Sequence, residues 1–115
     1  RNYAMPSSII ARESKNKNCF IAEGCEIYGT ITHSIISTGC TVDSGAIVED
    51  SVIMPNVHIE SGVIIRHAII GEDCRICRGA VIGGSFAPGE EKKISVVGKA
   101  KTIAENTAIK PGEIY

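Results

Sequence analysis

The sequence predicts an all-β fold, in which one chain winds as a single-stranded parallel β-helix of six-residue repeats, triangular in section, with about five coils. Three observations predict this fold. Ile and Val recur with a period of 17 residues. Small residues stand two positions before most of the recurring Ile and Val residues, and Gly, Asn or Asp stands where the chain has to turn.

The recurring Ile and Val residues define three faces of the prism. At a spacing of 17 they form three columns, for the first, second and third face respectively: Ile36, Ile53 and Ile70; Val42, Ile59 and Ile76; Val48, Ile65 and Ile82. The columns extend upstream to Ile21, Ile27 and Ile31, and downstream to Val97, Ile103 and Ile109. Steps of five and six residues do not form one stripe on an α-helix of 3.6 residues per turn. Each short strand is therefore expected to pair with the strand one coil away, at about 4.8 Å.

Alternation along each strand predicts the remaining inward side chains. Residues two before each anchor also point inward, and on the three faces in turn they are Cys19, Ser34, Ser51, Ala68 and Ser95; Cys25, Cys40, Val57 and Cys74; Gly29, Ala46, Val63 and Ala80. Lys101 breaks the second series, so we expect it near an end, where its amine reaches water.

Corners between the faces favour residues that adopt a left-handed backbone conformation cheaply. Two columns of such residues are present: Gly24, Gly39, Asn56 and Asp73; Gly45, Gly62, Gly79 and Asn106. We expect each column to form one corner of the prism.

The cysteines allow two interpretations. Five are present, an odd number that falls at positions of the repeat, which favours a reducing, cytoplasmic setting. Cys25, Cys40 and Cys74 share one inward column, so stacked thiols could bind a metal, or Cys25 and Cys40 could form a disulfide. The interpretation as small buried apolar residues is preferred, and we predict no metal ligands.

The outward residues, one before each anchor, predict an interface. On the first face they are Phe20, Ile35, Val52, Ile69 and Val96, and on the third Thr30, Ile47, Ile64, Val81 and Ala108. The second face is polar, with Glu26, Thr41, His58, Arg75 and Thr102. Because large exposed apolar surfaces mark contact sites, we expect the first face to pack on another domain or subunit.

Two further features are a column of ionisable residues at the remaining corner and an insertion in the repeat. At the remaining corner His33, Asp50 and His67 stack at intervals of 17, a pattern that fits a metal or catalytic site but is more typical of charge satisfaction at an exposed corner. Residues 84–93 (GSFAPGEEKK) break the rhythm, and their Gly, Pro and charge content predicts a projecting loop.

Length and charge limit the function classes. The 115 residues suffice for one domain, divided into an N-terminal connector or cap at 1–18 and a β-helix domain at 19–115. The net charge is −1 without a basic run, so neither nucleic acid nor a membrane is an expected partner. The first residues lack the features of a signal peptide, and an internal-looking Arg1 suggests a fragment of a longer chain.

Two stretches carry a family resemblance. The hexapeptide pattern is typical of a broad class with a left-handed β-helix, which includes acyltransferases, gamma-type carbonic anhydrases and C-terminal domains of sugar nucleotidyltransferases. More specifically, CFIAEGCEIYGTITHSIISTGCTVDSGAIVEDSVIMPNV (19–57) and ISVVGKAKTIAENTAIKPG (94–112) resemble the C-terminal region of bacterial ADP-glucose pyrophosphorylase (glucose-1-phosphate adenylyltransferase). The ending is closer to the GlgD-type accessory subunit.

This resemblance implies a parent protein that makes ADP-glucose from ATP and glucose 1-phosphate for glycogen biosynthesis. The family's catalytic residues lie in an N-terminal nucleotidyltransferase domain that is not in this sequence, so no catalytic or cofactor-binding residue carries over and this domain is expected to be non-catalytic. The family's β-helix supports homo- or hetero-oligomer assembly and lies beside a regulatory site for sugar phosphates or other anions. Arg66 and His67 are the nearest match to that site's basic wall, although two solvated corner residues would look the same.

Three alternatives stay open. A hexapeptide acyltransferase would act as a trimer with acyl-coenzyme A between prisms, and His58 would be its catalytic base. A gamma-type carbonic anhydrase needs three His around one zinc, and the close His pair of that family is missing. A scaffold that binds no ligand would share most expectations with the adenylyltransferase interpretation.

Overall fold

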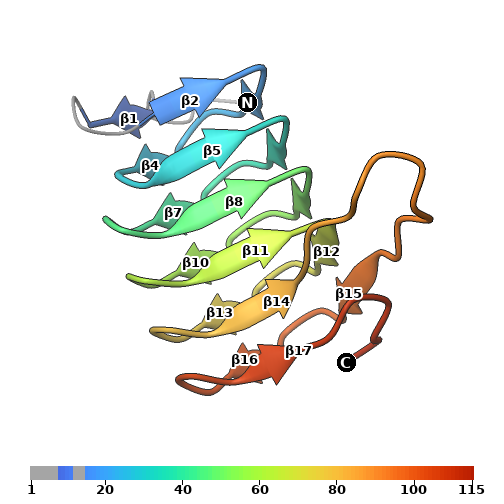
Figure 1. Cartoon of the computed structure of the whole chain (residues 1–115). Helices are drawn as coiled ribbons and strands as arrows, with labels where there is room; N and C mark the ends of the chain where they lie inside the picture. Colours follow the sequence, from blue (N-terminus) through green and yellow to red (C-terminus); the bar gives the residue numbers. More distant parts are fainter. Residues whose placement is uncertain (1–7, 12–14) are drawn as a thin grey trace.

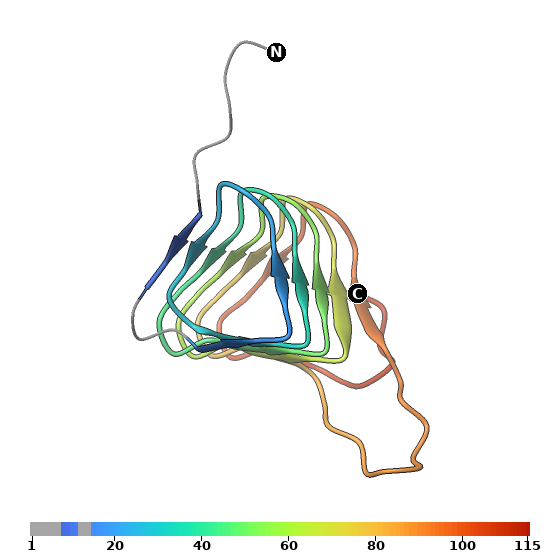
Figure 2. The ribbon, with the colours of Figure 1, turned by 90° about the horizontal axis from the view of Figure 1, so that it is seen from above.

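The computed structural model describes residues 8–11 and 15–115, which wind into a parallel β-helix of triangular section (Figures 1 and 2). None of the described residues is helical, and accordingly no helix in this part of the chain could cross a membrane. Viewed from the N-terminal end in Figure 2, the chain runs counter-clockwise as it recedes, which is the left-handed sense. The predicted fold class is therefore confirmed.

The three faces are three parallel sheets of six, six and five strands. The second face contains β1 (Ile9–Ile10), β4 (Glu26–Ile27), β7 (Thr41–Val42), β10 (His58–Ile59), β13 (Arg75–Ile76) and β16 (Thr102–Ile103). The third contains β2 (Lys15–Lys17), β5 (Thr30–Thr32), β8 (Ile47–Glu49), β11 (Ile64–Arg66), β14 (Val81–Gly83) and β17 (Ala108–Ile109). The first contains β3 (Phe20–Ile21), β6 (Ile35–Ile36), β9 (Val52–Ile53), β12 (Ala68–Ile70) and β15 (Ser95–Val97).

Strand pairing reproduces the register read from the sequence. Ile53 pairs with Ile36 on one side and Ile70 on the other, so the coils repeat at the predicted spacing. The exception is the coil that begins at β3, where Ile21 pairs with Ile36 and the step between β4 and β5 is short. Gly29 lies in that step, and a Cβ there would approach the carbonyl oxygen of Ala46 to 2.6 Å, so only glycine lets the shortened coil close.

Two strands lie upstream of the predicted domain boundary at residue 19. β1 pairs with β4 and β2 pairs with β5, so the second and third sheets begin inside the stretch predicted as a connector. The loop predicted at 84–93 lies between β14 and β15, contains no strand and projects from the prism (Figures 1 and 2). The remaining residues of the predicted connector, 1–7 and 12–14, lie outside the described residues.

The interior is the predicted column of large and small residues. All nine central Ile and Val anchors have no exposed surface, and the small inward residues from Cys25 onward are buried beside them. Cys19 is only partly buried, since it lies in the first coil of its face. Lys101 is exposed as expected, with its amine 5.8 Å from the ring centre of Tyr115.

Inward serines complete the hydrogen bonding at one corner. Ser34 Oγ donates to the carbonyl of Thr32 and accepts the amide hydrogen of Ser51, one coil further on. Ser51 Oγ repeats this arrangement, donating to the carbonyl of Glu49 and accepting from the amide of Ala68. A buried amide without a partner is costly, so the hydroxyls explain why this inward column is polar.

The inward thiols of Cys25, Cys40 and Cys74 are buried, which agrees with their interpretation as small buried apolar residues. All five cysteines are free, and Cys25, Cys40 and Cys74 donate to the carbonyls of Ser37, Met54 and Gly98 at 3.0–3.1 Å. Among the described residues no group of three or more His, Cys, Asp or Glu side chains could hold a metal ion.

We expect the domain to lose stability in alkali through Cys40. Burial, reinforced by the neighbouring Cys25, raises the pKa of the Cys40 thiol from 9.0 to about 11. The neutral thiol therefore contributes stability that is fully present below about pH 9 and is lost as the pH rises towards 11. Two pKa units correspond to about 2–3 kcal/mol, measurable by urea unfolding at several pH values.

The matched control is Cys40→Val, because Val57 occupies the same inward column one coil further on. This variant should lack the additional loss of stability between about pH 9 and 11. If the two proteins lose stability equally over that range, Cys40 is not the responsible group.

Candidate functional site

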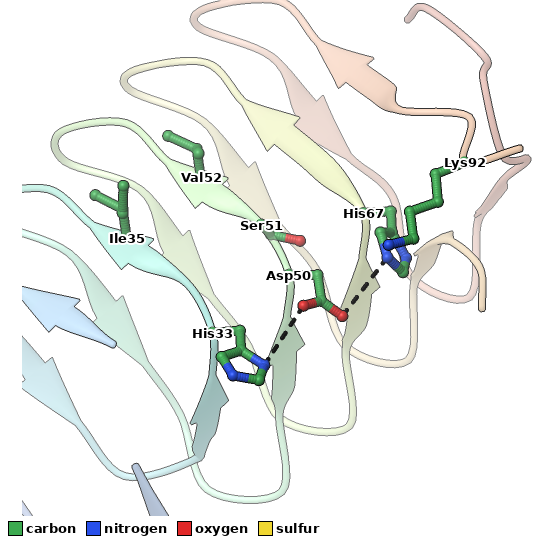
Figure 3. A pocket seen from close by; sticks show the side chains of 7 residues that line it. All are labelled: His33, Ile35, Asp50, Ser51, Val52, His67 and Lys92. Carbon is green, nitrogen blue, oxygen red and sulfur yellow. Dashed lines mark ion pairs between the residues drawn. The ribbon is translucent and has the colours of Figure 1, made fainter. Parts of the chain in front are cut away.

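The best-defined groove lies where the first face meets the projecting loop. Its volume is about 310 Å³, and its lining residues are His33, Ile35, Asp50, Ser51, Val52, His67 and Lys92 (Figure 3). Ile35 and Val52 supply an apolar floor from β6 and β9, and Lys92 reaches over from the loop (Figure 3). The groove therefore combines apolar surface with a row of ionisable groups.

The ionisable row is the predicted corner column. Asp50 lies between the two histidines, with Oδ1 3.7 Å from His33 Nδ1 and Oδ2 3.6 Å from His67 Nε2 (Figure 3). All three residues have left-handed backbone angles, with φ between 48° and 51°. One carboxylate thus faces two imidazoles, an arrangement that satisfies charge at a corner.

His67 also connects the corner to the loop. Its Nδ1 lies 2.9 Å from the carbonyl oxygen of Gly84, and the Phe86 ring meets its edge with centroids 5.1 Å apart. The side chain is largely buried, with 14% of its surface exposed. No sequence signal predicted the contacts with Phe86 and Lys92, because a loop of this length can fold in many directions.

The two residues predicted to bind a regulatory anion already have partners. Arg66 Nε donates to Glu49 Oε1 at 2.7 Å, and His67 contacts Gly84 and Asp50. An anion at Arg66 and His67 would compete with two carboxylates. The cation that reaches the groove from the loop is Lys92, which was not among the predicted ligands.

The predicted interface residues form one apolar stripe along the first face, from β3 to β15: Phe20, Ile35, Val52, Ile69 and Val96. Phe20 is 64% exposed, Ile35 49% and Ile69 40%. The other two are partly buried. The stripe presents side chains that are usually covered in a folded assembly, although its role as an interface stays a prediction.

His58, the predicted base of an acyltransferase, lies on the polar second face. Its Nε2 is 3.0 Å from Asp43 Oδ2, and the next coil carries the corresponding pair of Arg75 and Glu60 at 2.7 Å. The Arg75 guanidinium lowers the pKa of Glu60. His58 is thus one member of a repeated surface pair, away from the groove of the first face.

The hexapeptide geometry agrees with a known family. The model of the family described as "GlmU-like, C-terminal hexapeptide" matches residues 6–103. The chain belongs to this family. This membership fits the left-handed coil and the repeat register.

Among curated proteins, this family member is similar to glucose-1-phosphate adenylyltransferases. The protein from Clostridium perfringens (strain 13 / Type A) is 38% identical over 110 residues, covering 95% of this chain and 28% of the relative. The protein from Fervidobacterium nodosum is 41% identical over 116 residues, with the same coverage of 95% and 28%. The chain therefore spans little more than a quarter of the length of these relatives.

Among solved structures, the GlmU-like hexapeptide chain resembles the acetyltransferase domain of PglB from Neisseria gonorrhoeae FA1090 in complex with acetyl coenzyme A. The TM-score is 0.73 with 21% sequence identity, covering 98% of this chain and 55% of the other. An identity this low supports the shared fold and says nothing about shared chemistry.

Proposed function

We propose that this chain is the C-terminal β-helix domain of a glucose-1-phosphate adenylyltransferase, which makes ADP-glucose from ATP and glucose 1-phosphate. The observation that carries the proposal is the 38–41% identity to such enzymes across 95% of the chain. The domain serves assembly and regulation, and the chemistry takes place in an N-terminal nucleotidyltransferase domain. The GlgD-type assignment and a cytoplasmic location, which the five free thiols favour, are parts of the same proposal.

The apolar stripe of the first face gives the assembly role its physical basis. Three of its five side chains are at least 40% exposed, and they line up on consecutive strands instead of being scattered. Covering them with the N-terminal domain or with another subunit, of the same or a different kind, would remove this apolar surface from water.

A regulatory anion such as a sugar phosphate is the second part of the proposal. Arg66 and His67 remain the predicted ligands, and the groove adds Lys92 at the same corner. Because Glu49 and Asp50 compete for both predicted ligands, the anion would displace at least one of these contacts. Isothermal titration with inorganic phosphate, compared between wild type and Arg66→Gln, tests whether an anion binds.

The activity proposal is tested by assaying ADP-glucose formation in the full-length protein and in the isolated domain. Because no catalytic residue of the family was found in this sequence, we expect the 115-residue chain alone to be inactive. We expect His58→Ala to leave the activity of the full-length protein unchanged, because His58 pairs with Asp43 on the polar face. A full-length protein without adenylyltransferase activity would contradict the proposal, whereas acyl transfer that disappears in His58→Ala would establish the acyltransferase alternative.

A further inference from the structure

One side chain of the prism, His67, contacts the projecting loop at two points. His67 Nδ1 is 2.9 Å from the carbonyl oxygen of Gly84, the first residue of the loop. Phe86 packs edge-on against the same imidazole, with an interplanar angle of 73°. The loop lines the groove at the first face through Lys92, and it lines a second groove of about 540 Å³ through Phe86, Glu90, Glu91 and Lys93. The contacts of His67 therefore influence the walls of both grooves.

The hydrogen-bond partners of His67 determine which of its ring nitrogens carries a hydrogen. A carbonyl oxygen only accepts, so Nδ1 carries a hydrogen in order to bond Gly84. In a neutral imidazole Nε2 would then be an acceptor, and it faces another acceptor, Asp50 Oδ2, at 3.6 Å. In the doubly protonated ring Nε2 becomes a donor with a positive charge, so the same geometry turns from repulsive to attractive.

The surrounding charges come from several elements. The Asp50 carboxylate lies 3.6 Å from His67 Nε2, and Lys92 lines the same groove. His33 faces the other oxygen of Asp50, and His33 Nε2 lies 3.1 Å from the side-chain nitrogen Nδ2 of Asn18. Arg66, the last residue of β11 and the one before His67, forms an ion pair with Glu49. Asp50 is thus the charged residue that forms an ion pair with His67.

We propose that the contacts of His67 with Gly84 and Asp50 hold the 84–93 loop against the prism only when the His67 ring is doubly protonated. We call this pair of contacts the latch. The latch is closed when both ring nitrogens of His67 carry a proton, because His67 then donates a hydrogen bond to Gly84 and forms an ion pair with Asp50. Its contribution is present while the ring is doubly protonated and is lost when a rise in pH removes the Nε2 proton. Loss of the Nε2 proton leaves two acceptors facing each other and loosens the loop.

The test combines two measurements on the wild type and on Asp50→Asn. Nitrogen-15 NMR of the His67 ring reports which of its nitrogens are protonated. Hydrogen exchange of the amides in residues 84–93, corrected for the intrinsic effect of pH, reports how firmly the loop is held against the prism. As the pH is raised and the NMR signals show the Nε2 proton leaving the wild-type ring, we expect loop exchange to rise by about threefold or more. An asparagine amide can donate to neutral Nε2, so loop exchange in Asp50→Asn should stay nearly constant.

Two control variants make the outcome decisive. Asp43→Asn makes the same change in the His58 pair, which does not contact the loop, and it should behave as wild type. Lys92→Gln should keep the pH-dependent step, because imidazolium and not the lysine amine bridges to Asp50. The proposal is overturned if Asp50→Asn keeps the wild-type pH dependence, if Lys92→Gln abolishes it, or if wild-type loop exchange does not rise when the Nε2 proton leaves the His67 ring.

Discussion

Ile53→Asp is expected to unfold the domain. Ile53 has no exposed surface and lies at the centre of the interior column, between Ile36 and Ile70. Truncating a buried Ile alone costs about 2–5 kcal/mol, and an unpartnered carboxylate adds the cost of desolvating a polar group. The sum approaches the 5–15 kcal/mol that typically separates a folded domain from its unfolded chain.

Circular dichroism and thermal unfolding measure this effect, and Thr41→Asp is the matched control. Thr41 is an outward residue of β7, so its carboxylate would remain in contact with water. We expect the control to change stability by less than about 1 kcal/mol. A cooperative transition for Ile53→Asp near the wild-type temperature would contradict the inward orientation of the anchor column.

The repeat made most of the fold predictable. Each coil imposes the same requirements on its residues. An inward position such as Ile53, or a corner position such as Asn56, therefore recurs in the sequence once per coil and can be recognised by its repetition. Every residue of the two predicted corner columns has a left-handed backbone angle, with φ between 58° at Asn106 and 83° at Gly45. In a fold without repeats a single Asn or Asp would carry much weaker information.

The third corner was less predictable. Asn18, His33, Asp50 and His67 also have positive φ angles, a conformation that is uncommon for residues other than glycine. The stacked backbone enforces it, because neighbouring strands fix where each corner must turn. Composition therefore identified the two corners that contain glycine and missed the conformation of the corner that contains histidine.

The candidate site was predictable only where it belongs to the repeat. The spacing identified Asp50 and its two histidines, which the structure brings together. It could not place Lys92 or Phe86, because the loop has no repeat partner that fixes its direction. The outward stripe was predicted in full, but a sequence of one chain does not contain the surface that would cover it.

Charge in the middle of the apolar stripe should therefore disrupt assembly and not folding. Val52 lies between Ile35 and Ile69 on the first face, and its side chain points away from the interior. In Val52→Lys the prism should remain stable, because the new amine can reach water in the isolated domain. At a covered interface the same lysine would be buried without an opposite charge, at a cost of several kcal/mol.

Thr41→Lys, on the polar second face, is the matched control, because both positions are outward and partly buried. Thermal unfolding of the isolated domain should show only small changes for both variants. Sedimentation velocity of the full-length protein should separate them, because a cost of about 3 kcal/mol weakens association about a hundredfold. A defect confined to Val52→Lys would show that a partner covers the first face. Equal, negligible effects at the two positions would show that the stripe from Phe20 to Val96 is exposed in the assembled protein, and that its apolar character requires a different explanation.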